Sequence, residues 1–291
     1  MKVHLVDGTY ELFRAHFGAP PRRGADGGEV GATVGLLRSL FALVSTPGVT
    51  HVACAFDHVV ESFRNDLFPG YKTSAGVDAE LLAQFPLAER AVSALGLVVW
   101  PMIEFEADDA LATGAARYRQ EPGVEQVVVC SPDKDLAQTV SGTSVVCWDR
   151  RRGIVLDEDG VVAKFGVRPH SMPDWLALVG DAADGYPGIP GWGAKSAAAV
   201  LARFERLEAV PEDPAALGLP LGRATRLLDG LSAHREEALL YRRLARLRDD
   251  VPLHEGLGDL EWRGPGPELE QVCHELGDDE LPRRAMRRGG E

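Results

Sequence analysis

Residues 125–135 read EQVVVCSPDKD, an apolar run that ends abruptly in acidic side chains. The run is short, rich in valine and bounded by polar residues, which is typical of a buried β-strand. The same pattern recurs where VHLV precedes Asp7, VACAF precedes Asp57 and VVWPMIEF precedes Glu106. Helix-type patterns separate these runs, so the sequence predicts an α/β fold with a mostly parallel central sheet flanked by helices.

The predicted elements divide the chain near residue 165. We expect strands at residues 3–6, 51–56, 97–100, 125–130 and 144–148. We expect helices at residues 10–16, 29–44, 78–95, 106–119 and 134–139, with loops at 18–28 and 69–76. Beyond residue 165 the β-branched runs disappear and helix formers dominate, interrupted by the Gly/Pro-rich segment 185–193. This change predicts a second, helical subdomain.

The composition is that of a globular protein and excludes disordered and fibrous classes, with 45% hydrophobic and 26% charged residues among 291. Acidic residues outnumber basic ones by 44 to 31, so any nucleic-acid contact would depend on local positive patches. No apolar run approaches the roughly 20 residues of a membrane-spanning helix. Asp7 and Glu11 interrupt the region where a signal peptide would be apolar. The four cysteines are scattered and form no C-x-x-C pair, which favours reduced thiols in a cytoplasmic protein without membrane contact.

The acids after the strands admit two interpretations. Each lies at a plausible helix start, where Asp or Glu caps free N–H groups and interacts well with the helix dipole. The carboxyl ends of neighbouring parallel strands, however, meet at one edge of a sheet. Like charges gathered there repel one another unless a cation neutralises them. The acids concerned are Asp7, Asp57, Glu106, Asp108, Asp109, Asp133 and Asp135.

An oxygen-only ligand set without His or Cys favours Mg²⁺ or Mn²⁺ over zinc. Asp181 and Asp184 add two carboxylates at a spacing that can direct both toward one ion. These acids exceed the needs of one ion and indicate a two-ion site, whose typical chemistry is phosphodiester hydrolysis. Two similar motifs are excluded. Residues 5–9, LVDGT, lack the nucleophilic aspartate of haloacid-dehalogenase phosphatases, and the lysine of Gly188–Ser196 stands one residue late for a phosphate-binding P-loop.

Candidate nucleic-acid contacts surround these acids. The tight turn containing Gly188, Gly191 and Gly193 leads into a helix whose free N–H groups can bind phosphate, and Lys195 and Ser196 follow it. The alternative is an ordinary connection between helices, but the position directly after Asp181 and Asp184 favours a phosphate site. The further candidates are Arg14, Arg64, Tyr71 as a platform for an unpaired base, and Lys72 as a partner of the scissile phosphate. Solvated surface charge is the alternative for Arg14 and Arg64.

The ordered set of motifs resembles the 5′-nuclease family of flap endonucleases and the 5′–3′ exonuclease domain of bacterial DNA polymerase I. The resemblance covers about residues 2–255 and is carried by LVDG (5–8), AFD (55–57), FRNDLFPGYK (63–72), EADD (106–109), SPDKDLAQ (131–138) and GDAADGYPGIPGWGAKSA (180–197). EADD alone is weak evidence, whereas the ordered set is specific.

The resemblance implies a PIN-like nuclease core at residues 1–165 with a helical arch at about 60–95. It also implies a DNA-binding subdomain with a helix–hairpin–helix motif at 166–255 and a C-terminal extension at 256–291. Two or more Mg²⁺ or Mn²⁺ ions are expected, with K⁺ at the hairpin turn. Lys72 matches the catalytic lysine and Arg14 a phosphate-contacting arginine. The implied metal ligands are Asp7, Asp57, Glu106, Asp108, Asp109, Asp133, Asp135, Asp181 and Asp184.

We therefore expect a stand-alone monomeric 5′–3′ exonuclease and flap endonuclease without a polymerase domain. Its expected substrates are flap, nicked or 5′-ended duplex DNA, including RNA–DNA hybrids. The sequence departs from the family at Ala75, where an arch arginine is usual, at Pro132, where glycine is usual, and at Gly185, where asparagine is usual. The alternatives are a PIN-like RNA nuclease, a catalytically silent protein that binds DNA junctions and, more distantly, a metal phosphatase.

Overall fold

The computed structural model describes residues 1–18 and 20–289, so the last two residues of the predicted extension 256–291 lie outside the described part. The chain forms two compact units, each discontinuous in sequence. Unit 1 consists of Met1–Val60, Ser74–Ser131 and Asp249–Glu291. Unit 2 consists of Glu61–Thr73 and Pro132–Arg248.

Unit 1 contains the parallel sheet that the sequence predicts. Its strands are β1 (Lys2–Asp7), β2 (His51–Asp57), β3 (Val98–Met102) and β4 (Gln126–Cys130), in the order β3-β2-β1-β4. All neighbouring pairs among them are parallel. The central strand β1 is buried from Val3 to Asp7, because helices cover both faces of the sheet. This explains why the strands are continuous apolar runs.

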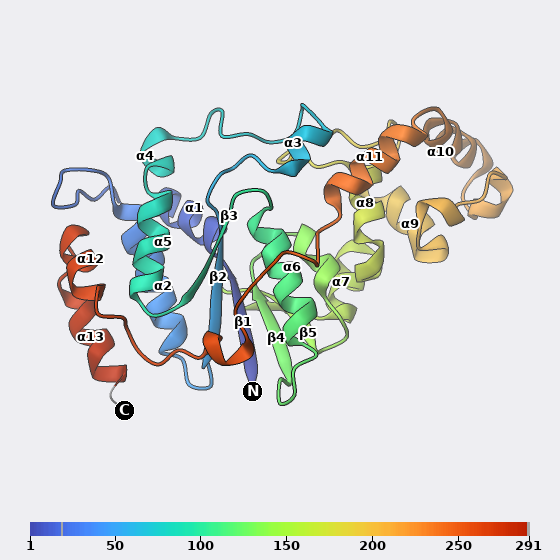
Figure 1. Ribbon diagram of the computed structural model, residues 1–291. Coiled ribbons are helices and arrows are strands. Elements are labelled where there is room, and N and C mark those ends of the chain that lie inside the picture. Colours follow the sequence, from blue (N-terminus) through green and yellow to red (C-terminus); the bar gives the residue numbers. More distant parts are fainter. Residues whose placement is uncertain (19, 290–291) are drawn as a thin grey trace. The chain divides into compact units, whose positions relative to one another are not determined.

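Helix α6 packs against all four of these strands, while α1, α2 and α5 form the layer on the other face (Figure 1). The helices of unit 1 in this part of the chain are α1 (Gly8–Gly18), α2 (Gly31–Val44), α4 (Ala79–Leu82), α5 (Phe85–Ala94) and α6 (Ala107–Tyr118). Helix α2 contacts both α1 and α5, which places its apolar side against these two helices.

Two predicted helices differ from those observed. The expected helix at residues 78–95 is wrong, because the structure has the separate helices α4 and α5. Asp78 caps the first of them by accepting a hydrogen bond from the Glu80 N–H, and Pro86 lies in the first turn of the second, where its missing N–H costs nothing. The expected α-helix at residues 134–139 is the 3₁₀-helix η1 (Asp135–Thr139).

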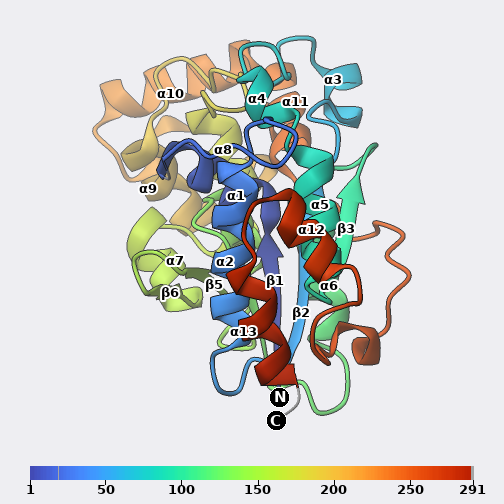
Figure 2. The same ribbon diagram turned by 90° about the vertical axis from the view of Figure 1, so that its left-hand side faces the viewer.

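The C-terminal segment of unit 1 packs on the α/β core of the same unit. It contains η5 (Leu257–Leu260), α12 (Leu269–Glu275) and α13 (Glu280–Gly289), and Figure 2 shows α12 and α13 lying over the layer formed by α2 and α5. The Trp262 indole donates a hydrogen bond to the Leu95 carbonyl oxygen at 2.9 Å. Gly96 has a left-handed φ of 86°, and a Cβ there would lie 2.1 Å from the Gly264 carbonyl oxygen. Only glycine fits this contact.

Unit 2 is mainly helical, as expected for the second half of the chain. The antiparallel hairpin of β5 (Val145–Asp149) and β6 (Ile154–Leu156) is the exception, and β6 was not predicted. Helix α8 packs against both α11 and α9. The helices are α3 (Phe63–Leu67), α7 (Glu158–Phe165), η2 (Pro169–Ser171), α8 (Met172–Val179), α9 (Ala194–Phe204), η3 (Leu207–Ala209), η4 (Pro214–Leu217), α10 (Leu221–Ala233) and α11 (Arg235–Ala245). Within the described residues, no helix has the length and apolar character needed to cross a membrane.

Candidate active site

Asp7 and Asp57 are the last residues of β1 and β2, as the strand-end pattern predicts. The Asp7 carboxylate accepts hydrogen bonds from the Tyr10 N–H and from the Ser131 hydroxyl, both at 2.8 Å. Ser131 directly follows β4, the neighbour of β1 in the sheet. Asp7 is only 5% exposed, so these two donors replace most of its contact with water and hold both oxygens in place.

Asp57 links its strand to the start of α6. Its Oδ1 accepts a hydrogen bond from the Ala107 N–H at 2.8 Å, and its own N–H donates to the Thr9 hydroxyl at 2.8 Å. Asp57 is therefore not at the start of a helix of its own, but its carboxylate satisfies a free N–H of α6, since Ala107 is the first residue of that helix. A carboxylate oxygen has further lone pairs, so this hydrogen bond leaves Asp57 able to bind a cation.

The EADD motif forms the N-terminus of α6. Asp109 is fully buried, and its Oδ2 accepts a hydrogen bond from the Glu106 N–H at 3.0 Å. Glu106 is 4% exposed, whereas Asp108 is half-buried. The side chain of Asp109 thus caps its own helix, and Asp108 is the most accessible carboxylate of the motif.

Three carboxylates of unit 2 are crowded together. One oxygen each from Asp135, Asp181 and Asp184 lies within 4.8 Å of the others, and all three residues are buried. Asp133 is exposed, and its Oδ1 accepts a hydrogen bond from the Asp135 N–H at 2.9 Å. We call Asp135, Asp181 and Asp184 the acidic cluster. The sequence predicted all three members as ligands of one metal site.

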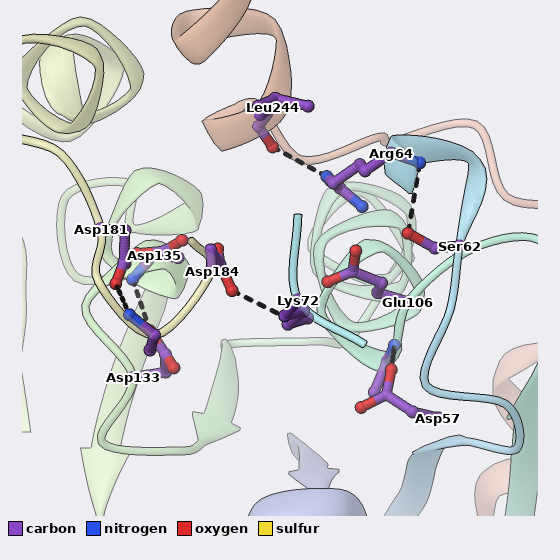
Figure 3. A network of polar contacts seen from close by, with 12 residues as sticks. Asp57, Ser62, Arg64, Lys72, Glu106, Asp133, Asp135, Asp181, Asp184 and Leu244 are labelled. Carbon is purple, nitrogen blue, oxygen red and sulfur yellow. Dashed lines mark hydrogen bonds and ion pairs between the residues drawn. The ribbon is translucent and has the colours of Figure 1, made fainter. Parts of the chain in front are cut away.

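Two lysines contact the acidic cluster. The Lys134 ammonium contacts Asp181 Oδ2 and lies 3.7 Å from Asp135 Oδ1. The Lys72 ammonium lies 3.2 Å from Asp184 Oδ1 (Figure 3). Lys134 was not among the predicted site residues, although its place between Asp133 and Asp135 could have indicated it.

The electrostatics of the acidic cluster are unfavourable for Asp135. Burial, followed by the nearby Asp133 and Asp184 carboxylates, raises the pKa of Asp135 well above its usual value. Burial alone would lower the pKa of Lys134, but the surrounding carboxylates outweigh it and raise that pKa to about 12. Asp135 Oδ1 is buried without a hydrogen-bond partner among the described residues. A hard divalent cation fits this oxygen-only set, because it would neutralise the charge and coordinate the unsatisfied oxygen.

Arg64 and Tyr71 are buried, which corrects the prediction that their side chains contact DNA. Arg64 is 1% exposed, and its Nε donates a hydrogen bond to the Leu244 carbonyl oxygen at 2.8 Å. Tyr71 is 3% exposed, so its ring offers no accessible face for base stacking. The sequence could not reveal this, because Leu244 lies 180 residues from Arg64 along the chain.

Arg14 is partly buried on α1. Its guanidinium contacts the Glu11 carboxylate and lies 3.2 Å from the Ser39 hydroxyl oxygen. Its side chain is 30% exposed, and Nε is buried without a hydrogen-bond partner in the described residues. Arg14 therefore has a neutralising partner in Glu11, and a phosphate contact remains a prediction.

The glycine turn before α9 has different requirements at each position. Gly188 has a φ of 75°, and a Cβ there would lie 2.5 Å from the Gly180 backbone nitrogen. Gly191 also has a left-handed φ, of 84°, but open space surrounds it. Gly193 caps α9 and donates its N–H to the Ser196 hydroxyl at 3.0 Å. Lys195 is exposed at this helix start.

Ser196 corrects another predicted DNA contact. It is 3% exposed, and its hydroxyl donates back to the Gly193 carbonyl oxygen at 3.0 Å. The side chain is therefore engaged in capping α9. Sequence reasoning also missed Ser131 and Tyr186. Tyr186 has a buried hydroxyl without a hydrogen-bond partner in the described part of the chain, and burial raises its pKa.

Family models match most of the chain. Residues 2–166 match the 5′–3′ exonuclease N-terminal resolvase-like domain, and residues 167–268 match the 5′–3′ exonuclease C-terminal SAM fold. The chain belongs to the 5′–3′ exonuclease family. This membership confirms the resemblance drawn from the motifs.

Individual relatives agree with this assignment. The chain is 32% identical to a 5′–3′ exonuclease of Bacillus subtilis (strain 168), over 87% of this chain and 85% of that protein. It is 38% identical to DNA polymerase I of Rhizobium leguminosarum over 86% of this chain, but it spans only 25% of that protein's length. A bacteriophage T5 flap endonuclease solved with DNA and metal ions has a TM-score of 0.66 and 16% identity, covering 100% of both chains. The last comparison shows a shared fold.

Proposed function

We propose that this chain is a structure-specific 5′-nuclease that hydrolyses DNA phosphodiesters and leaves 5′-phosphate and 3′-hydroxyl ends. Membership in the 5′–3′ exonuclease family makes it a metal-dependent phosphodiester hydrolase. The observation that carries the proposal is the acidic cluster with its buried, unsatisfied Asp135 oxygen. A bound cation would neutralise the carboxylate charge that Lys72 and Lys134 leave unbalanced at neutral pH.

The proposed cofactors are two or more Mg²⁺ or Mn²⁺ ions. Their candidate ligands are Asp135, Asp181 and Asp184 in unit 2, with Asp133 beside them, and Asp7, Asp57, Glu106, Asp108 and Asp109 in unit 1. When bound, the ions supply a water of lowered pKa and positive charge for the reacting oxygens. Support for more than one ion comes from the family resemblance and from the number of carboxylates.

The protein's own groups have separate proposed roles. The Lys72 ammonium donates to the non-bridging oxygens of the scissile phosphate as their charge grows. Asp184 orients that ammonium at 3.2 Å in the absence of substrate. Ser131 and the Tyr10 N–H fix the two oxygens of Asp7. Arg14 contacts a phosphate of the cleaved strand.

The proposed duplex contact is the helix–hairpin–helix turn. Gly191 and Gly193 present backbone without a Cβ obstructing the approach, and the exposed Lys195 adds a positive charge at the start of α9. Gly188 acts by packing the turn against the end of α8. Free N–H groups at this helix start bind phosphate without reading sequence, and carbonyl oxygens of the turn are the candidate K⁺ ligands.

The domain roles follow the sequence division. We assign the nuclease core to residues 1–165, duplex binding together with the metal-ligand candidates Asp181 and Asp184 to 166–255, and a supporting role to the extension 256–291, while the arch at about 60–95 would steer the 5′ end. The proposed substrates are flap, nicked and 5′-ended DNA and RNA–DNA hybrids. The T5 flap endonuclease, which shares the fold, was solved with DNA. A cytoplasmic location agrees with the four buried free cysteines, and we propose that the chain acts as a monomer.

The deciding experiment compares release of a labelled 5′ fragment from flap, nicked, gapped and single-stranded DNA, each with Mg²⁺, Mn²⁺ or chelator. We expect metal-dependent cleavage that is fastest at a junction between single strand and duplex. Faster cleavage of a sequence-matched RNA would favour the PIN-like RNA nuclease. Tight junction binding without cleavage would favour the catalytically silent alternative.

A further inference from the structure

We propose that Arg64 is a positioning residue that acts through Lys72. It anchors the segment Glu61–Thr73, which we call the strap, to the end of α11, and the strap holds the Lys72 backbone against the acidic loop 180–185. The inference rests on the proposed role of Lys72 in cleavage. Arg64, which the sequence predicted to contact DNA, would instead act within unit 2.

The anchor is formed by the Arg64 guanidinium and the last turn of α11. Nε donates to the Leu244 carbonyl oxygen at 2.8 Å (Figure 3), and Nη2 lies 3.3 Å from the Arg246 carbonyl oxygen. The guanidinium also lies 4.6 Å from the centroid of the Phe63 ring. Carbonyl oxygens in a helix's last turn lack partners within the helix, and a cation there interacts favourably with the helix dipole. The planar guanidinium can serve both oxygens at once.

The strap is stiff between Arg64 and Lys72. The Ser62 hydroxyl accepts from the Arg64 N–H at 3.3 Å, and Asn65 Oδ1 accepts from the Ser62 N–H at 2.8 Å. The other end of the same amide, Asn65 Nδ2, donates to the Lys72 carbonyl oxygen at 3.0 Å. Phe68 packs edge-on against Tyr241 of α11, with ring centroids 5.9 Å apart. A shift of α3 at the anchor would therefore be transmitted to Lys72.

The far end of the strap is bonded to the acidic loop. The Lys72 N–H donates to the Asp184 carbonyl oxygen at 3.0 Å. Gly185 has a φ of 91°, and a Cβ there would lie 2.2 Å from the Gly70 carbonyl oxygen, so the two backbones meet in direct contact. Tyr186 then stacks on Tyr241 at 5.5 Å, which connects the loop to the same helix that holds Arg64. Helix α11 thus fixes the positions of both the strap and the loop.

This arrangement sets the distance between the Lys72 ammonium and Asp184 Oδ1, which is 3.2 Å. Without the guanidinium, the strap would lose its anchor while Lys72 kept its charge and chemistry. The alternative is that Arg64 only stabilises unit 2. The two roles differ in how the effect of an Arg64 substitution depends on Lys72. If Arg64 acts through Lys72, its substitution no longer changes turnover once Lys72 has been replaced, whereas a purely stabilising role gives the same effect with or without Lys72.

The test is a double-mutant cycle of Arg64→Met and Lys72→Ala, with single-turnover cleavage of a 5′-flap DNA at saturating Mg²⁺. We expect Arg64→Met to lower the maximal cleavage rate about 10- to 100-fold, the range typical of groups that orient a functional side chain, with little change in flap affinity. In the Lys72→Ala background the same substitution should change the rate less than about threefold. Melting temperatures show which variants remain folded.

Arg242→Met is the matched control. Arg242 belongs to α11 and pairs with Asp174 at 3.1 Å, but none of its described contacts is with the strap. Its loss should lower stability and give the same rate ratio in both backgrounds. If Arg64→Met is too unstable, Asn65→Asp replaces it, because the aspartate keeps an acceptor for Ser62 and loses the donor to Lys72.

The outcomes separate the two levels of the proposal. Equal effects of Arg64→Met, or of Asn65→Asp in its place, with and without Lys72 would overturn the positioning role, as would a rate unchanged from wild type. Wild-type turnover in Lys72→Ala would overturn the role of Lys72 itself and the inference with it. An inactive wild-type protein would instead refute the proposed nuclease function.

Discussion

The carboxylates of unit 1 and those of unit 2 are held in different ways. In unit 1, Asp7, Asp57 and Asp109 accept hydrogen bonds from N–H or O–H groups of their own unit. In unit 2, Asp181 and Asp184 face lysine ammonium groups, and a buried Asp135 oxygen has no hydrogen-bond partner in the described residues. The first arrangement is satisfied by the protein alone, whereas the second requires added positive charge. The carboxylates of the two units follow similar sequence patterns, but their substitution should therefore have different effects on the protein.

The largest effect is expected where the unit 2 cluster loses a ligand. Asp181→Ala should lower flap cleavage by at least about 1000-fold, because a catalytic metal contributes several kcal/mol to the transition state. Single-turnover cleavage with Mg²⁺ measures the effect, and the exposed Asp229 of α10 provides a control in Asp229→Ala. Cleavage by Asp181→Ala within tenfold of wild type contradicts the metal assignment.

The next largest effects are expected from substituting two lysines of unit 2, Lys72 and Lys195. Lys72→Ala should lower kcat by about 100-fold, the size typical of losing one donor to a developing negative charge. Lys195→Ala should instead raise KM, since an exposed phosphate contact contributes mainly to binding. The decrease in DNA affinity with salt concentration should also become less steep, by the equivalent of about one phosphate contact. Steady-state kinetics at several salt concentrations distinguish the two, and the same pattern for both lysines would argue against separate roles.

A smaller effect is expected where unit 1 supplies its own donors. Ser131→Ala removes the hydroxyl that donates to Asp7 at 2.8 Å. We expect about a tenfold loss in activity at limiting Mg²⁺, as for other groups that orient metal ligands. Unfolding in urea should show a loss of about 1 kcal/mol, because a buried hydrogen bond is removed. If the activity of Ser131→Ala depends on Mg²⁺ concentration as that of wild type does, the result would contradict a role of Asp7 in metal binding.

The last expected effect is on stability rather than on cleavage, and it differs between the metal-free and the metal-bound protein. The raised pKa of Asp135 means that the folded state holds its proton at a pH where the unfolded chain has released it. The metal-free protein should therefore lose stability as pH rises above the unfolded value of about 4, by at most about 1.4 kcal/mol per pH unit. Asp135→Asn should lack this loss. Mg²⁺ should stabilise wild type more than Asp135→Asn at pH 7, and equal melting shifts would contradict the assignment.

The sequence predicted the elements whose signals are local. The short apolar runs identified β1 to β4, and the strand-end rule located Asp7 and Asp57. The strand β6 was missed because its apolar run, Ile154–Leu156, has only three residues, fewer than the four to eight that identify a strand from sequence. The helix expected at residues 78–95 was divided by its own capping and proline signals, which had been outweighed by the apolar periodicity.

The parts of the site that depend on distant contacts could not be predicted. Arg64 reads as a surface arginine until α11 brings its terminal carbonyl oxygens to the guanidinium. Ser196 reads as a phosphate ligand until its hydroxyl is seen to close the first turn of α9. Long-range packing decides burial, and burial decides whether a polar side chain serves the fold or a ligand.

The most direct test of the central claim is anomalous diffraction from crystals soaked in Mn²⁺. The account predicts a Mn²⁺ peak bounded by oxygens of Asp135, Asp181 and Asp184, with metal–oxygen distances of roughly 2.0–2.3 Å as expected for a small hard cation. A well-ordered cluster without a peak, with lysines still paired to all its carboxylates, would contradict it.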